Sequence, residues 1–149
     1  MRRNVARLFF LIGAAIIFLP GARGQAHASQ SDQFGPEVKA FLELMHQEEV
    51  ELDFQIRHNE ISRKEYVRSR NRIAILREHV LNRARQTGED RVPELHVVVA
   101  AEVDQIVDGG TKALKGVKPG TTIEGKWRYL GALIRGGESF YTFERLTGK

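Results

Sequence analysis

The chain is predicted to fold as an α+β domain, in which an antiparallel helical hairpin precedes a small antiparallel β unit. Two stretches, residues 36–57 and 63–86, repeat apolar side chains at helical spacing. A helix-capping sequence lies between them, and the C-terminal region is rich in β-branched and aromatic residues around a Gly-Gly pair. We therefore expect a helical hairpin over residues 36–87. A β-rich unit of about three strands and one short helix, residues 92–149, should pack on it.

The first 28 residues have the composition of a secretory signal peptide. A basic start with three arginines precedes twelve apolar residues, 8–19, and Ala26-His27-Ala28 forms an Ala-x-Ala cleavage site. A bilayer-spanning helix needs roughly 20 apolar residues, so the run is better suited to a cleaved signal than to a retained anchor. We expect cleavage near Ala28/Ser29 and a periplasmic or secreted protein. Contact with a membrane is expected only through the leader, if it is retained.

Cleavage would change the charge of the protein. Residues 1–28 contain four of the 23 basic residues and none of the 19 acidic residues, so 19 basic and 19 acidic residues remain. A neutral mature chain lacks the overall positive charge with which proteins attract nucleic acid, and nucleic acid is therefore excluded as an expected partner. The chain has no cysteine, which excludes disulfides, thiol nucleophiles and thiolate metal sites.

The two predicted helices are bounded by recognisable end signals. An irregular lead-in, residues 29–35, is expected to be disordered, and Pro36 suits the first helical turn because it lacks an N–H group. Ser62 and Glu65 have the spacing of a capping box, which starts the second helix. Gly88 provides a C-terminal stop. The hairpin therefore turns at residues 58–61.

Antiparallel folding about this turn brings together residues whose numbers sum to about 122, and apolar residues then face one another. The facing pairs are Ile56 with Tyr66, Met45 with Leu76, Leu42 with Val80, and Val38 with Ala84. Such matching indicates an αα-hairpin. Glu49 is an exception on this seam, and Arg70 and Arg77 are available to it on the second helix.

The β unit is predicted from short β-branched runs and turn residues. Residues 94–99 are read as a strand and 100–107 as about two helical turns. Lys118-Pro119-Gly120 has the composition of a type II turn. Two further runs, residues 122–134 and 139–146, flank Arg135-Gly136-Gly137-Glu138 and predict a hairpin. Alternation in the first run places four apolar residues on one face: Ile123, Trp127, Tyr129 and Leu133.

Charge is divided between the two predicted helices. Residues 29–56 hold seven acidic residues and one lysine, whereas residues 57–91 hold ten basic and five acidic residues. Most basic residues of the second helix are arginines, whose guanidinium groups suit bidentate binding of carboxylates. One interpretation is a contact surface for a partner, formed by Arg68, Arg72 and Arg83. The other is that the first helix neutralises the second within the hairpin.

The terminal hairpin gathers aromatic residues beside basic ones. Trp127, Arg128, Tyr129 and Tyr141 are the candidate binding residues here. An aromatic and basic groove suits a peptide or a glycan, whereas the competing interpretation makes the rings the core of the small β unit.

No motif predicts catalysis, a cofactor or a metal ion. The histidines form no HxH or HExxH pattern, and the glycine pairs lack the P-loop and dinucleotide-binding spacings. His46, Glu49 and Asp53 share one face of the first helix and are the best metal candidates. A solvated acidic face explains them as well, so no metal site is predicted.

The sequence as a whole favours an exported, non-catalytic protein that binds another protein or a peptide. The alternative is a small-molecule or glycan-binding domain that uses the aromatic hairpin, and an enzyme of unknown type ranks third. Leu44, Val50 and Phe54 lie on the outer side of the first helix and need cover, which either the β unit or a second copy of the chain could supply. Of the two, we favour a homodimer.

Overall fold

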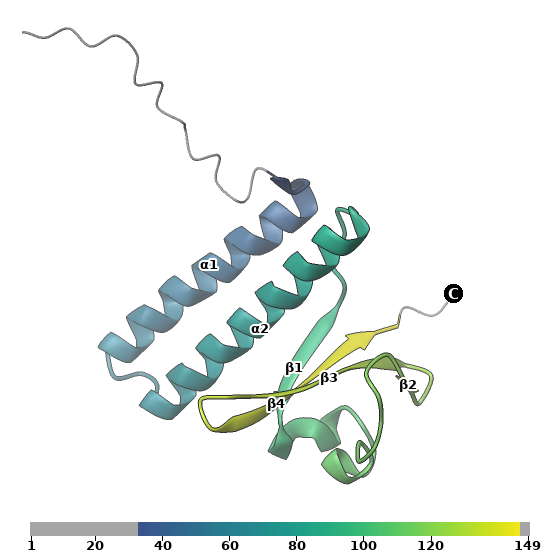
Figure 1. Ribbon diagram of the computed structural model, residues 1–149. Helices are drawn as coiled ribbons and strands as arrows, with labels where there is room; N and C mark the ends of the chain where they lie inside the picture. Colours follow the sequence, from purple (N-terminus) through teal and green to yellow (C-terminus); the bar gives the residue numbers. More distant parts are fainter. Residues whose placement is uncertain (1–32, 147–149) are drawn as a thin grey trace, which may run out of the picture.

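The computed structural model describes residues 33–146, in which a helical hairpin lies against one four-stranded sheet (Figure 1). Helices α1 (Pro36–Arg57) and α2 (Arg63–Thr87) lie side by side, and α2 lies between α1 and the sheet. The predicted α+β class with an N-terminal helical hairpin is confirmed. The predicted signal peptide, residues 1–28, lies outside the described residues.

Both ends of α2 follow the predicted capping signals. The Ser62 hydroxyl oxygen accepts a hydrogen bond from the Glu65 N–H at 3.2 Å, and the Glu65 carboxylate accepts one from the Ser62 N–H at 2.8 Å. These reciprocal bonds satisfy two donors that the start of α2 leaves without helical partners. At the other end, Gly88 adopts the left-handed conformation with a φ of +68°. The observed bounds of α1 match the predicted ones, and α2 ends one residue beyond its predicted end.

The start of α1 is capped from a distance rather than by its own neighbours. The carboxylate of Asp90 accepts hydrogen bonds from the N–H groups of Glu37 and Val38, both at 2.9 Å. The Glu37 carboxylate in turn accepts from the Val92 N–H at 2.8 Å. A Cβ atom on Gly35 would lie 2.2 Å from the Asp90 side chain, so the N-cap position must be glycine. These hydrogen bonds connect the first turn of α1 to residues 90–92, in the segment that follows α2.

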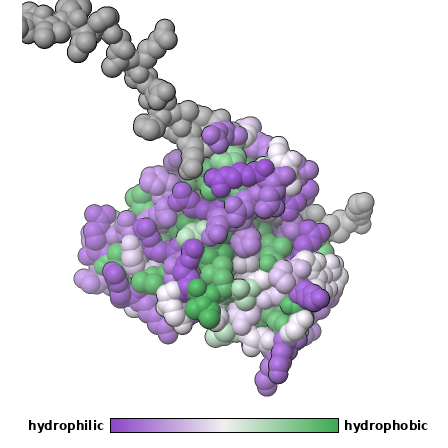
Figure 2. All heavy atoms as spheres, in the orientation of Figure 1, coloured by the Kyte–Doolittle hydropathy of each residue, from purple (hydrophilic) through white to green (hydrophobic). Residues whose placement is uncertain are grey.

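At the open end of the hairpin, the apolar seam has the predicted register, whereas Leu76, predicted to face Met45, packs on the sheet-side cluster. Val38, Val80 and Ala84 form one buried cluster, against which Leu42 packs. Phe34 packs against the same cluster, so the end of the predicted lead-in belongs to the folded domain. Among residues 33–146, nothing covers the outer side of α1. On the face seen in Figure 2, hydrophobic residues lie among hydrophilic ones. The exposed apolar side chains of α1 are Leu44, Val50 and Phe54.

The sheet contains one more strand than the sequence suggests. The strands are β1 (Leu95–Val99), β2 (Thr122–Ile123), β3 (Trp127–Arg135) and β4 (Glu138–Arg145), arranged antiparallel in the order β1-β4-β3-β2. Glu124 and Gly125 both have positive φ angles, so the chain turns there and divides the predicted run 122–134 into β2 and β3. The short helix predicted at 100–107 is a 3-10 helix, Ala100–Gln105, followed by another at Gly110–Lys112.

The two faces of the sheet bury different aromatic residues. Phe140 of β4 faces α2, where it packs with Ile75, Val97 and Val99. Phe143, three residues later, lies in the cluster on the opposite face. The 3-10 segment covers that second face, and its cluster comprises Val103, Val107, Leu114, Tyr129 and Phe143.

The prediction that Leu133 shares a face with Trp127 and Tyr129 is wrong. Leu133 packs instead with Phe140 on the α2 side. A register shift between Tyr129 and Gly131 inserts one residue into β3, and one inserted residue turns every later side chain to the other face. Among the residues that the structure describes, neither helix combines the length and the apolar character needed to cross a membrane.

Candidate functional site

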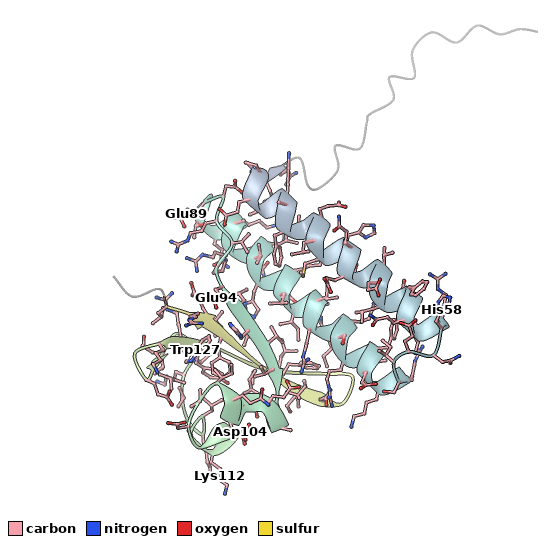
Figure 3. All side chains as sticks on the ribbon, turned by 180° about the vertical axis from the view of Figure 1, so that it is seen from behind. His58, Glu89, Glu94, Asp104, Lys112 and Trp127 are labelled. Atoms are coloured by element: carbon pink, nitrogen blue, oxygen red, sulfur yellow. The ribbon has the colours of Figure 1, made fainter. Side chains whose placement is uncertain are left out.

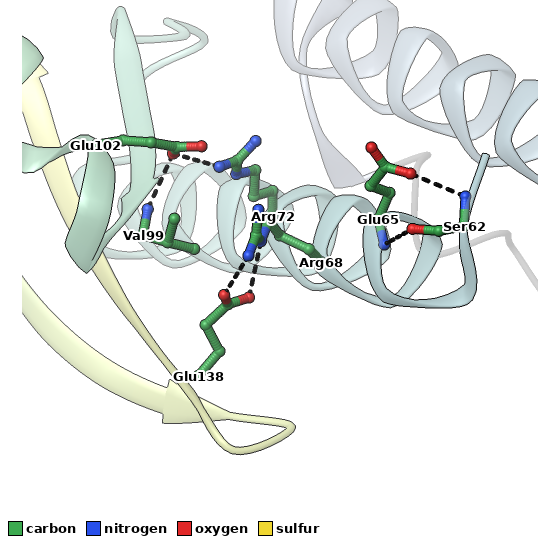
Figure 4. Close-up of polar contacts among 7 residues, drawn as sticks. All are labelled: Ser62, Glu65, Arg68, Arg72, Val99, Glu102 and Glu138. Carbon is green, nitrogen blue, oxygen red and sulfur yellow. Dashed lines mark hydrogen bonds and ion pairs between the residues drawn. The ribbon is translucent and has the colours of Figure 1, made fainter.

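The α2 arginines that the sequence suggests for partner binding face the β unit of their own chain. Their ion-pair partners are Glu138 for Arg68, Glu102 for Arg72 and Glu144 for Arg83. Arg68 binds its partner through two hydrogen bonds, from Nε to Oε2 at 2.9 Å and from Nη2 to Oε1 at 2.6 Å. Figure 4 shows Arg68 and Arg72 reaching from α2 towards these carboxylates. These arginines therefore join α2 to the sheet and its 3-10 segment.

The pKa directions of the two carboxylates in Figure 4 agree with this pairing. The hydrogen bonds from Arg68 hold the pKa of Glu138 below its usual value. Burial by itself would raise the pKa of Glu102, but hydrogen bonds from Arg72 and from the Val99 N–H outweigh burial and lower it. Both carboxylates are thus held in the ionised form that the arginines bind.

Two other arginines of α2 pair with α1, as the competing interpretation of the charge pattern expects. Arg77 Nη1 lies 3.2 Å from a Glu49 carboxylate oxygen, and Arg70 Nη1 lies 3.3 Å from one of Asp53. The Tyr66 hydroxyl also donates to Asp53, at 2.7 Å. Both carboxylates of the metal candidate set are thus engaged by cations. Over residues 33–146, the structure brings together no group of three or more His, Asp or Glu side chains suited to a metal ion.

The aromatic residues of the terminal hairpin belong mainly to the core. Tyr129 is buried, which raises the pKa of its hydroxyl, and Tyr141 packs against the same cluster. Trp127 is half-buried at the end of the sheet near Glu94 (Figure 3), with His96 edge-on at 4.8 Å between ring centroids. Arg128 lies on the opposite face and bonds to Glu144 at 3.1 Å. Binding of a glycan to these aromatic rings stays a prediction.

A groove lies where the first turns of α2 meet the turn between β3 and β4. We call it the basic groove. Its volume is about 600 Å³, and its lining residues are Arg63, Lys64, Val67, Arg68, Asn71, Arg135, Gly136, Gly137 and Glu138. Of the residues that the sequence suggests for partner binding, Arg68 lines this groove, whereas the candidate residues of the terminal hairpin lie elsewhere on the sheet.

The charges of this groove do not balance. Its lining contains four cations and one carboxylate, Glu138, which Arg68 already binds in two places. Arg63 lies over the ring of Tyr66, with 5.6 Å from Cζ to the ring centroid, and Lys64 acts on Glu138 through its charge alone. The groove therefore attracts anions, and it offers neither a histidine nor a second carboxylate for acid–base chemistry.

Glycine allows the hairpin turn to approach α2 closely. Gly136 and Gly137 have φ angles of +60° and +78°, as expected for a two-residue hairpin turn. A Cβ atom on Gly136 would lie 3.1 Å from the Asn71 side-chain nitrogen and 3.7 Å from Val67. The turn residues thus set both the strand reversal and the width of the groove.

The sequence points to Arg68 but not to the other cations of the groove. Arg63 and Lys64 follow the capping serine, and Arg135 starts the glycine turn, so each belongs to a motif that indicates local structure and not binding. No spacing in the sequence links residue 64 with residue 135. Their proximity depends on how α2 lies across the sheet.

Comparison with known proteins adds no relative. No protein-family model matches the chain, and no curated protein or solved structure matches it either. The geometry and the charge of the basic groove are therefore the basis for inferring the function.

Proposed function

We propose that the protein is an exported, non-catalytic binding protein that holds an acidic segment of a partner protein in the basic groove. The observation that carries this proposal is the excess of cations over carboxylates in a groove of about 600 Å³. A cleft lined by charges of one sign concentrates ligands of the opposite sign. The predicted signal peptide, residues 1–28, supports a partner in the cell envelope or outside the cell.

The composition of the groove suits a peptide better than a free ion. Val67 is 36% exposed at its wall, which offers apolar contact between the cations. The glycine turn leaves backbone open on the opposite wall, since a Cβ on Gly137 would meet nothing within 4 Å. A segment that alternates acidic and apolar residues would use both features.

Arginine and lysine side chains contribute differently to this binding. Arg135 makes a long contact of 3.5 Å to an exposed carboxylate of Glu78, and a bound carboxylate can replace it at little cost. Lys64 is exposed and has three rotatable N–H donors. The bidentate Arg68–Glu138 pair joins α2 to β4. Because both residues also line the groove, we describe this pair as its floor.

The test uses a fluorescein-labelled peptide of alternating glutamate and leucine, with a lysine–leucine peptide as its charge-reversed counterpart. Fluorescence anisotropy with the purified full-length protein should detect saturable binding of the acidic peptide only, and added salt should weaken it. Binding of both peptides, or of neither, would overturn the proposal.

Charge reversal in the groove separates specific from diffuse attraction. The double substitution Arg63→Glu and Lys64→Glu places acidic side chains in the first turn of α2, where the helix dipole favours them, so the fold should be retained. We expect the affinity for the acidic peptide to fall about tenfold, since each exposed pair contributes up to about 1 kcal/mol. The matched control, Lys112→Glu with Lys118→Glu, changes the net charge equally at exposed sites of the 100–121 segment and should keep the affinity.

A further inference from the structure

A second hollow lies under the C-terminal half of α2, towards the opposite end of the helix from the basic groove. We call it the His79 cleft. Its volume is about 310 Å³, and its lining residues are His79, Asn82, Arg83, Gln86, Pro93, Leu95, Leu130 and Glu144. The four residues from α2 follow at intervals of three, one and three, so they form one face of the helix over two turns.

The cleft exists because the side chains between α2 and the sheet change from apolar to polar. Near the middle of α2, Ile75 packs directly on Phe140. The next positions of β4 on the same face are Thr142 and Glu144, both buried. A carboxylate in this position must be solvated or paired, so the helix and the sheet enclose a polar hollow there instead of a dry contact.

Two guanidinium groups share the carboxylate of Glu144, which lines the cleft. One oxygen of Glu144 accepts from Arg83 Nη1 at 3.0 Å, and the other accepts from Arg128 Nη1 at 3.1 Å. Arg83 belongs to the lining, whereas Arg128 lies behind Glu144, outside it. These three groups together carry one surplus positive charge. Among the described residues, Arg83 Nε is buried without a hydrogen-bond partner, although a guanidinium can donate five hydrogen bonds.

The remaining polar groups of the cleft are uncharged at neutral pH. Burial lowers the pKa of His79, and the charge of the adjacent Glu78 only partly offsets this effect. A neutral imidazole both donates and accepts hydrogen bonds, as do the side-chain amides of Asn82 and Gln86. Three such groups beside one surplus cation suit a ligand that carries one negative charge and several hydroxyl or amide groups.

We infer that the His79 cleft binds a small organic carboxylate that bears hydroxyl groups, with its carboxylate towards Arg83 and its hydroxyls towards His79, Asn82 and Gln86. The volume lies at the lower end of the range for ligand pockets, about 300–1,000 Å³, which suits a single sugar acid better than a peptide. Pro93, Leu95 and Leu130 provide the apolar part of the wall. This inference is independent of the basic groove.

The test is an NMR titration of the ¹⁵N-labelled protein with three probes: glucuronate, glucose and acetate. Glucuronate should give saturable shifts confined to the residues that line the cleft. Glucose lacks the charge and acetate lacks the hydroxyls, so each should bind at least about tenfold more weakly, which corresponds to one lost charge-assisted or paired contact. Equal binding of glucose and glucuronate, or no saturable shift with glucuronate, would overturn the inference.

Substitutions then assign the binding to this cleft. Asn82 and Gln86 are exposed, so Asn82→Ala with Gln86→Ala should leave the fold intact and weaken glucuronate binding about tenfold. Gln105→Ala is the matched control, because Gln105 is an exposed amide in the 3-10 segment, on the opposite face of the sheet. Unchanged affinity in the double variant would refute the assignment. An excess of the acidic peptide should not displace glucuronate, which separates this site from the basic groove.

Discussion

Helix α2 contacts α1 on one side and the sheet on the other, and its ion pairs on the two sides differ in exposure. Towards α1, the side chains of Arg70 and Asp53 are 40% and 47% exposed. Towards the sheet, those of Arg83 and Glu144 are 31% and 11% exposed. The same pairing of residue types therefore contributes differently to stability, because solvent screens the Arg70–Asp53 pair more strongly than the Arg83–Glu144 pair.

The apolar contacts of the two sides differ as well. On the sheet side, Ile75 and Phe140 are almost fully buried in a cluster that includes both faces of the contact. On the α1 side, the buried cluster lies at the open end of the hairpin, where Asp90 also caps α1. We infer that the sheet holds α2 more firmly than α1 does, and matched substitutions on the two sides of α2 test this difference.

The largest effect is expected from the apolar contact with the sheet. Phe140→Ala removes a fully buried ring and should lower the free energy of unfolding by about 3–5 kcal/mol. Phe54→Ala on the outer side of α1 is the matched substitution, and it should cost less than about 1 kcal/mol because that ring is 43% exposed and stacks only on His58. Urea denaturation monitored by circular dichroism measures both, and similar losses would contradict the comparison.

The next effect concerns the carboxylates that pair with α2. Glu144→Gln keeps the shape of the side chain but leaves Arg83 and Arg128 without their negative partner, so we expect a loss of about 1–3 kcal/mol. Glu49→Gln breaks the pair with Arg77 on the α1 side, and there we expect at most about 1 kcal/mol. A larger loss for Glu49→Gln would reverse the order of the two interfaces.

The cap at the start of α2 supports both interfaces equally. Ser62→Ala removes the acceptor for the Glu65 N–H and should cost about 1 kcal/mol. Ser62→Asp keeps an acceptor and adds a charge that the helix dipole favours, so it should retain the wild-type stability. Chemical denaturation of the two variants distinguishes loss of the cap from a general intolerance of substitution at this position.

The smallest effect is expected in the pH dependence of stability. Arg68 lowers the pKa of Glu138 below 4.5, so the unfolded chain binds more protons than the folded chain as the pH falls through this range. The contribution of this pair is therefore complete above about pH 4.5, and it is lost as the pH decreases to the lower pKa of the folded state. Thermal unfolding between pH 7 and pH 3 should show a shallower acid dependence for Glu138→Gln than for the unchanged protein. Identical slopes would show that Glu138 does not contribute.

The sequence predicts the helices better than the sheet because their signals are local. The capping box and the apolar repeat each involve residues within one or two helical turns, so α1 and α2 begin where expected. The β3 bulge depends on pairing with β4, and alternation in the sequence cannot show where one residue is inserted. The alternation therefore predicts the wrong face for Leu133.

The candidate site also combines features with local sequence signals and features that depend on long-range contacts. Local residue patterns establish that α2 is arginine-rich, that an acidic helix precedes it and that a glycine turn follows Arg135. Which arginines α1 and the sheet neutralise, and which cations remain open in the basic groove, depends on how the elements pack. Helical periodicity sets the direction of a side chain around its own helix axis, whereas charge compensation depends on neighbours far away in the chain. Arg68 and Glu138, 70 residues apart, make the bond that closes the floor of that groove.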